Sequence, residues 1–385
     1  MSWSTVRADQ FCTLITDGTH DSPKPQQSGW KLITSKHLKG HYIDFDSANW
    51  ISEADYLKVI SRSAVEQWDI LFSMIGTIGN IYLEKNPHVE YACKNMGIFK
   101  FSGNKENALW MYYYLRSPQA KAYIQTHLRG STQAYVPLGG LREMPVPVPP
   151  QTVRNEIIAI LRPIDEKIEC NNAINDNLQQ QAMALYAEMF LNSSDNNVTS
   201  GTLSDIAAIT MGQSPSGISY NEDGVGEVFY QGRAEFGFRF PKRRLFTTEP
   251  KRMAETGDVL LSVRAPVGDL NVAYERCCIG RGLGAIHSKT GHSSFVLYTM
   301  FALRSQLDVF NGEGTVFGSI NRDALNAIPI DIPPVTEIDQ FEAVAHPIDE
   351  LIRANYEENC RLEAIRDSLL PKLMSGEIDV SAVQL

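Results

Sequence analysis

Residues 144–178 read MPVPVPPQTVRNEIIAILRPIDEKIECNNAINDNL, and residues 328–362 read IPIDIPPVTEIDQFEAVAHPIDELIRANYEENCRL. The second stretch repeats the first at a constant separation of 184 residues. The matching residues include two proline pairs, two PIDE motifs and two asparagines, namely Pro149-Pro150 with Pro333-Pro334, Pro163–Glu166 with Pro347–Glu350, and Asn171 with Asn355. Because self-similarity at a fixed period indicates repeated architecture, the chain is built from two copies of one unit.

Fainter repeats lie in the globular stretches on either side. WDILFSMIGTIGNIYL begins at Trp68 and matches GDVLLSVRAPVGDLNVA, which begins at Gly257. GSTQAYVPLGGL begins at Gly130 and matches GTVFGSINRDAL, which begins at Gly314. A globular part and a helix therefore alternate twice, which implies a pseudo-two-fold molecule. We divide the chain into two globular domains and two helical spacers, at residues 1–150, 151–195, 196–334 and 335–385.

Segments 151–195 and 335–385 are predicted to be long helices. Their apolar residues follow 3-and-4 spacing at about two per seven, which is typical of a coiled-coil pair rather than a core helix. The residues expected at the contact between the helices are Ile157, Leu161, Ile168, Leu178 and Leu185 in the first, and Phe341, Ile348, Ile352, Leu362 and Leu369 in the second. Pro163 and Pro347 predict a kink or a restart. Asn171 and Asn355 interrupt the apolar pattern, and they either fix the helix register or are solvated.

The globular parts are predicted to be mixed α/β. Short apolar runs bounded by Gly and Asp, such as residues 70–73 and 259–263, favour strands. Residues 108–127 and 293–307 favour matching helices. The expected fold class is therefore α/β (α+β), with two mixed globular domains separated by two long helices.

The chain has 385 residues, 43% of them hydrophobic and 21% charged, which is typical of a globular protein of two or three domains. Its net charge of −10 is uneven: residues 1–150 carry +2 and 196–334 carry −1, whereas 151–195 carry −4 and 335–385 carry −7. The acidity therefore argues against DNA contact for the two helical segments only.

Cellular location is predicted from what the chain lacks. It has no apolar run of about 18 residues, the length that spans a bilayer. Met1–Ser4 do not begin a signal segment, and the six cysteines do not form a disulfide framework. We therefore expect a cytoplasmic protein with no membrane contact.

Catalytic and metal-binding motifs are missing. The sequence has no GxxxxGK[ST] phosphate loop, no HExxH and no CxxC. His20, His37, His127, His287 and His346 share no ligand spacing. The acidic residues of PIDEK are interpreted as a solvated helix face. We expect no metal site and no catalytic residue.

Polar and basic loop residues are the candidates for DNA contact. Gln and Arg pair bidentately with adenine and guanine edges, while Lys, Ser and Thr suit phosphates. The candidates in the first copy are Asp17, Gly18, Thr19, His20, Lys31, Thr34, Ser35, Lys36, Ser73, Gly76, Thr77, Ser131, Thr132 and Gln133. Those in the second copy are Tyr230, Gln231, Gly232, Arg233, Lys242, Arg243, Arg264 and Thr315. Ordinary surface loops are the alternative.

Three of these positions carry finer expectations. Gly232 is expected to let the backbone approach a groove closely. Arg233 is expected either to contact a base or to pair with a local carboxylate such as Glu235. Arg264 stands at the repeat position of Ile75, so the two copies differ there as readers of different sequences should.

The ordered motifs together resemble a known family. They are ITDGTHDSP, WDILFSMIGTIGN, GDVLLSVRAPVGD, GSTQAYVPLGGLREMPVPVPP, IPIDIPP and the tail SLLPKLMSGEI. Each is weakly specific alone. In this order, and twice, they resemble the DNA specificity subunits of type I restriction–modification systems, and the resemblance covers essentially the whole chain.

The resemblance implies that each globular domain is a target-recognition domain for one half of a bipartite double-stranded DNA sequence. It implies that the two helices form an antiparallel coiled coil that sets the unread spacer. Two methyltransferase subunits would bring adenine methylation and S-adenosylmethionine. Restriction (translocase) subunits would bring ATP, Mg²⁺ and cleavage. The chain itself would hold no cofactor, and it would work in a bacterial or archaeal cytoplasm, associated with the nucleoid.

Two other classes of function stay open. One is a stand-alone DNA-binding or decoy module without methyltransferase partners, which co-purification with a methyltransferase subunit would exclude. The other is a nuclease of unrecognised fold, which a metal- and cofactor-dependent activity of the purified chain would support.

Overall fold

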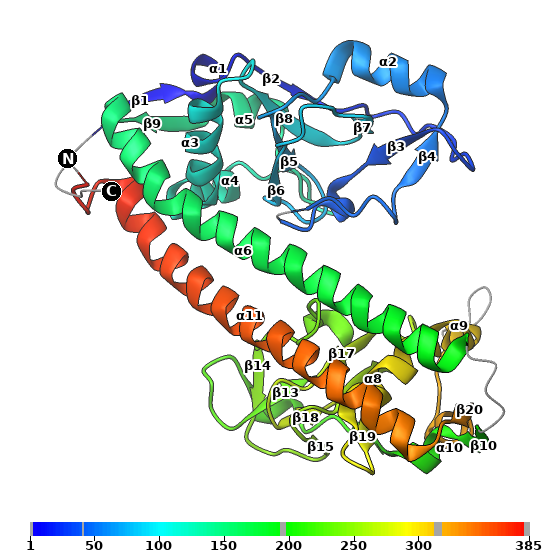
Figure 1. The fold of residues 1–385 in the computed structure, drawn as a ribbon. Helices are drawn as coiled ribbons and strands as arrows, with labels where there is room; N and C mark the ends of the chain where they lie inside the picture. Colours follow the sequence, from blue (N-terminus) through cyan, green and yellow to red (C-terminus); the bar gives the residue numbers. More distant parts are fainter. Residues whose placement is uncertain (1–2, 41, 193–197, 312–317, 381–385) are drawn as a thin grey trace. The chain divides into compact units, whose positions relative to one another are not determined.

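The computed structural model of the protein describes residues 3–40, 42–192, 198–311 and 318–380. Its contacts divide the chain into two compact units. Unit 1 is Met1–Asn171 with Glu358–Leu385, and unit 2 is Asn172–Glu357. Each unit has its own sheets and contains part of each of two long helices, α6 (Gln151–Tyr186) and α11 (Val335–Ser375) (Figure 1).

Unit 1 is built on a four-stranded antiparallel sheet in the order β2-β8-β5-β6. Its strands are β2 (Leu14–Asp17), β8 (Met96–Lys100), β5 (Ile70–Ser73) and β6 (Ile81–Leu83). Every residue of β5 is buried, because alternate side chains enter different cores. Ile70 and Phe72 join the core that includes the long helices, whereas Leu71 joins a second core.

A second sheet of unit 1 has the order β4-β3-β7, with β3 and β7 parallel. These strands are β4 (Asn49–Ile51), β3 (Trp30–Ile33) and β7 (Tyr91–Cys93), and a separate pair joins β1 (Ser4–Arg7) to β9 (Pro145–Val148). The helices are α1 (Ala8–Phe11), α2 (Glu53–Ser63), α3 (Lys105–Arg116), α4 (Pro118–Thr126) and α5 (Leu138–Glu143), with a short 3-10 turn at Ser35–His37.

Unit 2 repeats this topology. Its antiparallel sheet has the order β11-β19-β16-β17, formed by β11 (Ala207–Met211), β19 (Leu283–Ser288), β16 (Val259–Ser262) and β17 (Leu270–Val272). Its second sheet has the order β12-β14-β13-β18-β15, formed by β12 (Tyr220–Asn221), β14 (Leu245–Thr247), β13 (Glu227–Tyr230), β18 (Cys277–Ile279) and β15 (Met253–Ala254). Strands β13 and β18 are parallel, like β3 and β7. The predicted internal repeat and mixed α/β class are confirmed.

A separate strand pair of unit 2 also has a counterpart in unit 1. The pair β10 (Thr199–Thr202) and β20 (Pro329–Ile332) corresponds to β1 and β9. The helices are α7 (Leu203–Ile206), α8 (Ser293–Ala302), α9 (Arg304–Asp308) and α10 (Arg322–Asn326), with short 3-10 turns at Gly217–Ser219, Arg233–Glu235 and Val309–Asn311. A short π-helical turn, Ala187–Leu191, follows α6.

The two long helices pack antiparallel within each unit. In unit 1, Ile157 near the start of α6 shares a core with Leu373 near the end of α11. In unit 2, Tyr186 at the end of α6 shares a core with Phe341 near the start of α11. The expected contact residues Ile157, Leu161, Ile168, Phe341 and Ile352 are buried, and Leu178, Leu185, Ile348, Leu362 and Leu369 are partly buried. The helices therefore pair as expected, and they also complete the globular cores.

The helix restart expected at the two prolines does not occur. α6 continues through Pro163 for 36 residues, and α11 continues through Pro347 for 41 residues. A proline removes one backbone hydrogen bond from a helix. Buried neighbours on the same face, Leu161 and Ile168 around Pro163, supply the tertiary packing that keeps the helix continuous.

The asparagines of the helix contact are paired; Asn171, Asn175 and Asn359 are buried, and Asn355 is partly buried. In unit 1, Asn171 Nδ2 donates to Asn359 Oδ1 at 2.9 Å and to Glu358 Oε2 at 2.8 Å. In unit 2, Asn355 Nδ2 donates to Asn175 Oδ1 at 2.8 Å. The alternative of a solvated side chain is therefore wrong for Asn171, while Asn355 is paired and partly buried. Their role in fixing the helix register stays a prediction.

The aspartate of each PIDE motif ties its helix to the globular part of the same unit. Asp165 accepts hydrogen bonds from Arg116 of α3 at 2.8 Å and from Arg366 of α11 at 3.0 Å. The equivalent Asp349 accepts from Arg239 at 2.6 Å and from the Tyr298 hydroxyl at 2.9 Å. The expectation of a solvated face is corrected for Asp165, and the equivalent Asp349 is bonded in the same way to the globular part of unit 2.

Candidate nucleic-acid interface

The candidate loops of unit 1 lie at one edge of its sheets because of the directions in which the strands run. β2 and β5 are both antiparallel to β8, so Asp17 and Ser73 at their ends pair with Gly97 and Met96 at the start of β8. β3 runs parallel to β7, so Thr34 follows Ile33 beside Lys94. We define the first loop edge as residues 17–20, 34–36, 73–77, 94–95 and 129–135.

Gly18, at the first loop edge, allows the backbone of Cys93 to pack directly against it. A Cβ atom there would lie 2.3 Å from the carbonyl oxygen of Cys93, closer than any real side chain lies. The Gly18 amide donates to Met96 at 2.9 Å, and the Thr19 amide donates to Cys93 at 2.9 Å. Gly18 is therefore required for folding, whatever it contributes to DNA contact.

Asp17 and His20 form a polar cluster beside Gly18. His20 Nε2 lies 2.8 Å from Asp17 Oδ2, and its Nδ1 lies 2.8 Å from Asn95 Oδ1. Arg62 donates to Asp17 Oδ1 at 3.1 Å. Asp17 is largely covered by these partners, while His20 is exposed, so His20 is the member of the cluster available to DNA.

A basic cleft adjoins this cluster. It has a volume of about 390 Å³, and its lining contains Ser22, Pro23, Lys24, Pro25, Leu32, Thr34, Lys36, His37, Asn49 and Lys94. None of these described lining residues is acidic. Burial, together with the neighbouring Lys36, lowers the pKa of His37, so the positive charge of the cleft comes from its lysines. Thr34 and Lys36 were expected at a DNA surface, whereas Lys24 and Lys94 were missed.

Two other candidates of unit 1, Lys31 and Ser35, are at least partly buried. Lys31 donates to the carbonyl oxygen of Ala48 at 2.9 Å, and its ammonium lies 3.9 Å from the centroid of the Trp50 ring. Ser35 is buried in its 3-10 turn. The burial of Ser35 argues against direct DNA contact by its side chain, whereas contact by Lys31 stays a prediction.

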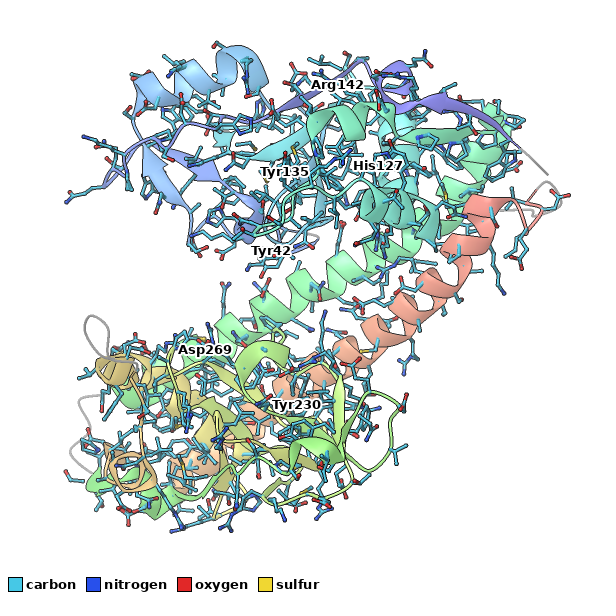
Figure 2. All side chains as sticks on the ribbon, turned by 180° about the vertical axis from the view of Figure 1, so that it is seen from behind. Tyr42, His127, Tyr135, Arg142, Tyr230 and Asp269 are labelled. Atoms are coloured by element: carbon cyan, nitrogen blue, oxygen red, sulfur yellow. The ribbon has the colours of Figure 1, made fainter. Side chains whose placement is uncertain are left out.

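The β5–β6 turn and the 129–135 loop lie side by side at the first loop edge. Ile75 forms a β-bridge with Tyr135, and the Val136 amide donates to Met74 at 2.9 Å. Figure 2 labels Tyr135, which is exposed. The expected contact residues Gly76, Thr77, Ser131, Thr132 and Gln133 are exposed here. Ser73 is fully buried, which removes its side chain from the candidates.

The candidate loops of unit 2 also lie together at one edge of its sheets. Met211 and Ser262 pair with Gly284 and Leu283 at the start of β19, and Tyr230 pairs with Ile279 at the end of β18. We define the second loop edge as residues 212–213, 231–233, 263–269 and 280–282. Arg264 bridges Ser319, and the Ile320 amide donates to Val263 at 3.1 Å. Arg264 therefore does occupy the place of Ile75, as the repeat predicted.

Tyr230 does not belong to the surface. Its side chain is 1% exposed and packs in a core with Val228 and Ile279, because β13 is an interior strand of its sheet. The expectation of a DNA contact at Tyr230 is corrected. Gln231 and Arg233 follow it and are exposed. A Cβ atom on Gly232 would meet no atom within 4 Å, so its close approach to a groove stays a prediction.

The basic residues of unit 2 differ in how far they are already neutralised. Arg243 pairs with Glu275 at 2.8 Å, and Arg244 pairs with Glu235 at 2.5 Å. Lys242 and Arg264 are exposed and have no ion pair or side-chain hydrogen bond within the described parts of the chain. Arg233 pairs with Asp269, not with Glu235. Thr315 lies outside the described residues.

Gln213 and Arg281 lie at the second loop edge and were missed. The Gln213 amide donates to Ile279 at 3.0 Å, and a Cβ on Gly212 would meet the Gly280 carbonyl oxygen at 2.1 Å, as Gly18 would meet Cys93. The signal was present in the sequence, because ITMGQS at residues 209–214 repeats ITDGTH at residues 15–20.

Within residues 3–40, 42–192, 198–311 and 318–380, no three His, Cys, Asp or Glu side chains gather in a group that fits a metal ion. The described helices include none that is long and apolar enough to cross a membrane.

Comparison with known proteins identifies relatives along the whole chain. A family model for the type I restriction modification DNA specificity domain matches residues 3–180 and 196–353, one match for each copy of the repeat. The putative type I restriction enzyme MjaX specificity subunit of Methanocaldococcus jannaschii is 26% identical, over 98% of this chain and 94% of that protein. The MjaIX specificity subunit of the same organism is 22% identical, over 90% of this chain and 86% of that protein.

A solved structure shares the fold. The S subunit of a type I restriction–modification system from M. genitalium aligns over 97% of this chain and 96% of that chain, with a TM-score of 0.53 and 15% identity. At that identity the likeness concerns the fold alone.

Proposed function

The chain belongs to the family of type I restriction–modification DNA specificity subunits, and from this premise we propose that each of its units reads one half of a bipartite DNA target. The observation that supports this is that the loops of the two units have equivalent backbone pairing but carry different side chains. Ile75 and Tyr135 bridge at the first loop edge, where Arg264 and Ser319 bridge at the second. Equivalent loops with different side chains suit half-sites of different sequence.

At the loop edges and in the basic cleft beside the first one, we assign two kinds of contact. Lys24, Lys36 and Lys94 surround a cleft without a described acidic lining residue, which suits a phosphate of the DNA backbone. Exposed side chains with directional donors and acceptors, such as Gln133 and Gln231, suit base edges. Phosphate contacts then fix the position of the loops, and base contacts give sequence preference.

We assign the chemistry to partner subunits. Two methyltransferase subunits would supply adenine methylation and S-adenosylmethionine, and restriction (translocase) subunits would supply ATP- and Mg²⁺-dependent translocation and cleavage. Val344 and Leu351 of α11 support a protein partner, because they are large apolar side chains exposed seven residues apart on one helix. We further propose that α6 and α11 set the unread spacer between the half-sites.

Exchange of one recognition domain tests the bipartite proposal. Residues 1–150 are replaced by the corresponding part of a relative that keeps an arginine at the place of Arg116, so that Asp165 retains its partner. We expect one half-site to change completely while the other half-site and the spacer stay the same. The measurement is methylome sequencing of cells that express the hybrid with its methyltransferase subunits.

The matched control exchanges residues 196–334 from the same relative and should change the other half-site only. If either exchange alters both half-sites, or if neither alters any, the two units do not read separately and the proposal fails.

The salt dependence of binding tests the assignment of phosphate contacts. Lys242→Ala removes an exposed ammonium without a described side-chain partner, so the slope of log affinity against log salt should fall by about 0.9, the effect of one phosphate contact. Arg243→Ala removes a guanidinium that Glu275 already pairs, so its slope should change less. The measurement is binding of the assembled methyltransferase to its target DNA over a series of salt concentrations. Equal changes in both variants would contradict the assignment.

A further inference from the structure

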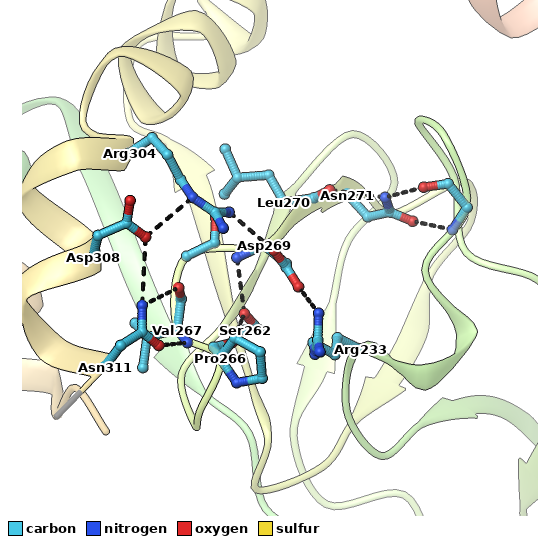
Figure 3. A network of polar contacts seen from close by, with 12 residues as sticks. Arg233, Ser262, Pro266, Val267, Asp269, Leu270, Asn271, Arg304, Asp308 and Asn311 are labelled. Carbon is cyan, nitrogen blue, oxygen red and sulfur yellow. Dashed lines mark hydrogen bonds and ion pairs between the residues drawn. The ribbon is translucent and has the colours of Figure 1, made fainter. Parts of the chain in front are cut away.

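Asp269 holds two guanidinium groups in the β16–β17 turn of unit 2 (Figure 3). One carboxylate oxygen accepts a hydrogen bond from Arg233, and the other accepts from Arg304 at 3.0 Å. Arg304 lies at the start of α9, where it also donates to the carbonyl oxygen of Gly268 and pairs with Asp308 at 3.4 Å. Asp269 is therefore held from the α9 side, and it presents its second oxygen to Arg233.

The turn that carries Asp269 is itself fixed on both sides. The Asp269 amide donates to Ser262 Oγ at 2.9 Å, and the Ser262 hydroxyl donates to the carbonyl oxygen of Pro266 at 2.8 Å. The Val267 amide donates to Asn311 Oδ1 at 2.6 Å, and Asn311 Nδ2 donates back to the Val267 carbonyl oxygen at 3.3 Å. These bonds keep the Asp269 carboxylate in one place, as a supporting residue requires.

Arg233 has hydrogen-bond donors that its contact with Asp269 does not use. Its side chain is 47% exposed at the second loop edge, and only one terminal nitrogen bonds to Asp269. Its other nitrogens have no partner within the described parts of the chain. A guanidinium is a rigid planar fork, so a carboxylate that holds one nitrogen also orients the others.

The donor geometry of the Arg233 guanidinium determines which group of DNA it can bind best. Guanine offers two acceptors, O6 and N7, at the major-groove edge, whereas adenine offers one acceptor and one donor there. A phosphate also accepts two hydrogen bonds, but the negative charge of Asp269 beside the fork opposes a second negative group. The arrangement therefore favours guanine over both alternatives.

We propose that Arg233 reads a guanine in the half-site of unit 2 and that Asp269 is its positioning residue. The proposal rests on the proposed function, since it names one base that the second unit reads. The equivalent of Asp269 in unit 1 is Asn80, whose amide donates to the carbonyl oxygen of Leu38 at 3.4 Å. Of the two equivalent turns, therefore, only the one in unit 2 carries a carboxylate that holds an arginine. Such a difference is expected if the two units read different half-sites.

Variants of the two residues test the proposal in the complex with the methyltransferase subunits. Binding is measured to the target DNA and to every single-base variant of it. Arg233→Ala and Asp269→Asn should each reduce discrimination at the same G·C pair, by roughly 5- to 150-fold for a lost bidentate contact. The double variant should be no worse there than Arg233→Ala alone, because the two residues act as one reader. Arg233→Lys should not restore discrimination, since an ammonium lacks the fork.

Controls separate base reading from phosphate contact and from folding. Arg276→Ala removes another exposed, carboxylate-paired arginine of unit 2 and should leave base preference unchanged. Thermal unfolding of each variant complex is compared with the wild type, and Asp269→Asn retains the backbone bond to Ser262. If Arg233→Lys keeps full discrimination, or if Arg233→Ala weakens all sequences equally, the guanine assignment is overturned. If Asp269→Asn leaves that base pair unaffected, Asp269 is not a positioning residue.

The wild-type complex separates this inference from the function on which it rests. If it reads a bipartite target while the variants change no base preference, only the inference fails. A wild-type complex without any bipartite preference would instead refute the proposed function.

Discussion

Replacing Asp165 with alanine should lower the free energy of unfolding of unit 1 by about 3–5 kcal/mol, the usual cost of removing one partner from a buried ion pair. Asp165 bonds to both Arg116 and Arg366, and the exposed fractions of the three side chains are 12%, 20% and 13%. The variant leaves two guanidinium groups in a largely buried place without their carboxylate. The measurement is urea unfolding of the full chain, followed by limited proteolysis to show which unit opens first.

The adjacent residue supplies the matched control. Glu166 is exposed and pairs with Arg162 one helical turn away at 3.5 Å, so Glu166→Ala should cost less than about 0.5 kcal/mol. Asp349→Ala should destabilise unit 2 in the same way, because its partner Arg239 is only 3% exposed. An Asp165→Ala chain as stable as the Glu166→Ala chain would show that the buried contact does not anchor the helix.

The repeat made much of the fold predictable. The 184-residue separation placed both long helices, and the faint match of WDILFS to GDVLLS placed two central strands that the structure shows as β5 and β16. These features follow from local pattern, which a sequence displays directly. The burial of Asp165 could also have been predicted from the sequence, because Leu161, Asp165 and Ile168 follow the same 4-and-3 spacing and so share one helix face.

Other features depend on contacts between distant residues. Tyr230 stands at the end of a strand, next to exposed loop residues, and nothing local shows that β14 and β18 enclose that strand. Arg243 looks like a free cation until Glu275, 32 residues away, is found beside it. Pairing of charged side chains across a fold is set by tertiary packing, so the sequence alone does not show which basic side chains of unit 2 are already neutralised by a carboxylate.

Lengthening both long helices by seven residues should change the recognised spacer while leaving both half-sites unchanged. The insertions follow Asn171 in α6 and Glu357 in α11, where the chain passes between the units, so both antiparallel helices gain one heptad at matching places. Seven residues preserve the apolar spacing and add about 10 Å of helix. Because one base pair rises about 3.4 Å, we expect a spacer longer by roughly three base pairs and no methylation of the original site.

A heptad inserted in α6 alone supplies the control. With α11 unchanged, the pairs Asn171–Asn359 and Asn175–Asn355 cannot both form, since their spacing on the two helices no longer agrees. Such a chain must leave buried amides unpaired or separate the helices, so it should methylate no site efficiently. Methylome sequencing reports both results. If the doubly extended chain keeps the original spacer, α6 and α11 do not set it, and the spacing must come instead from the methyltransferase subunits.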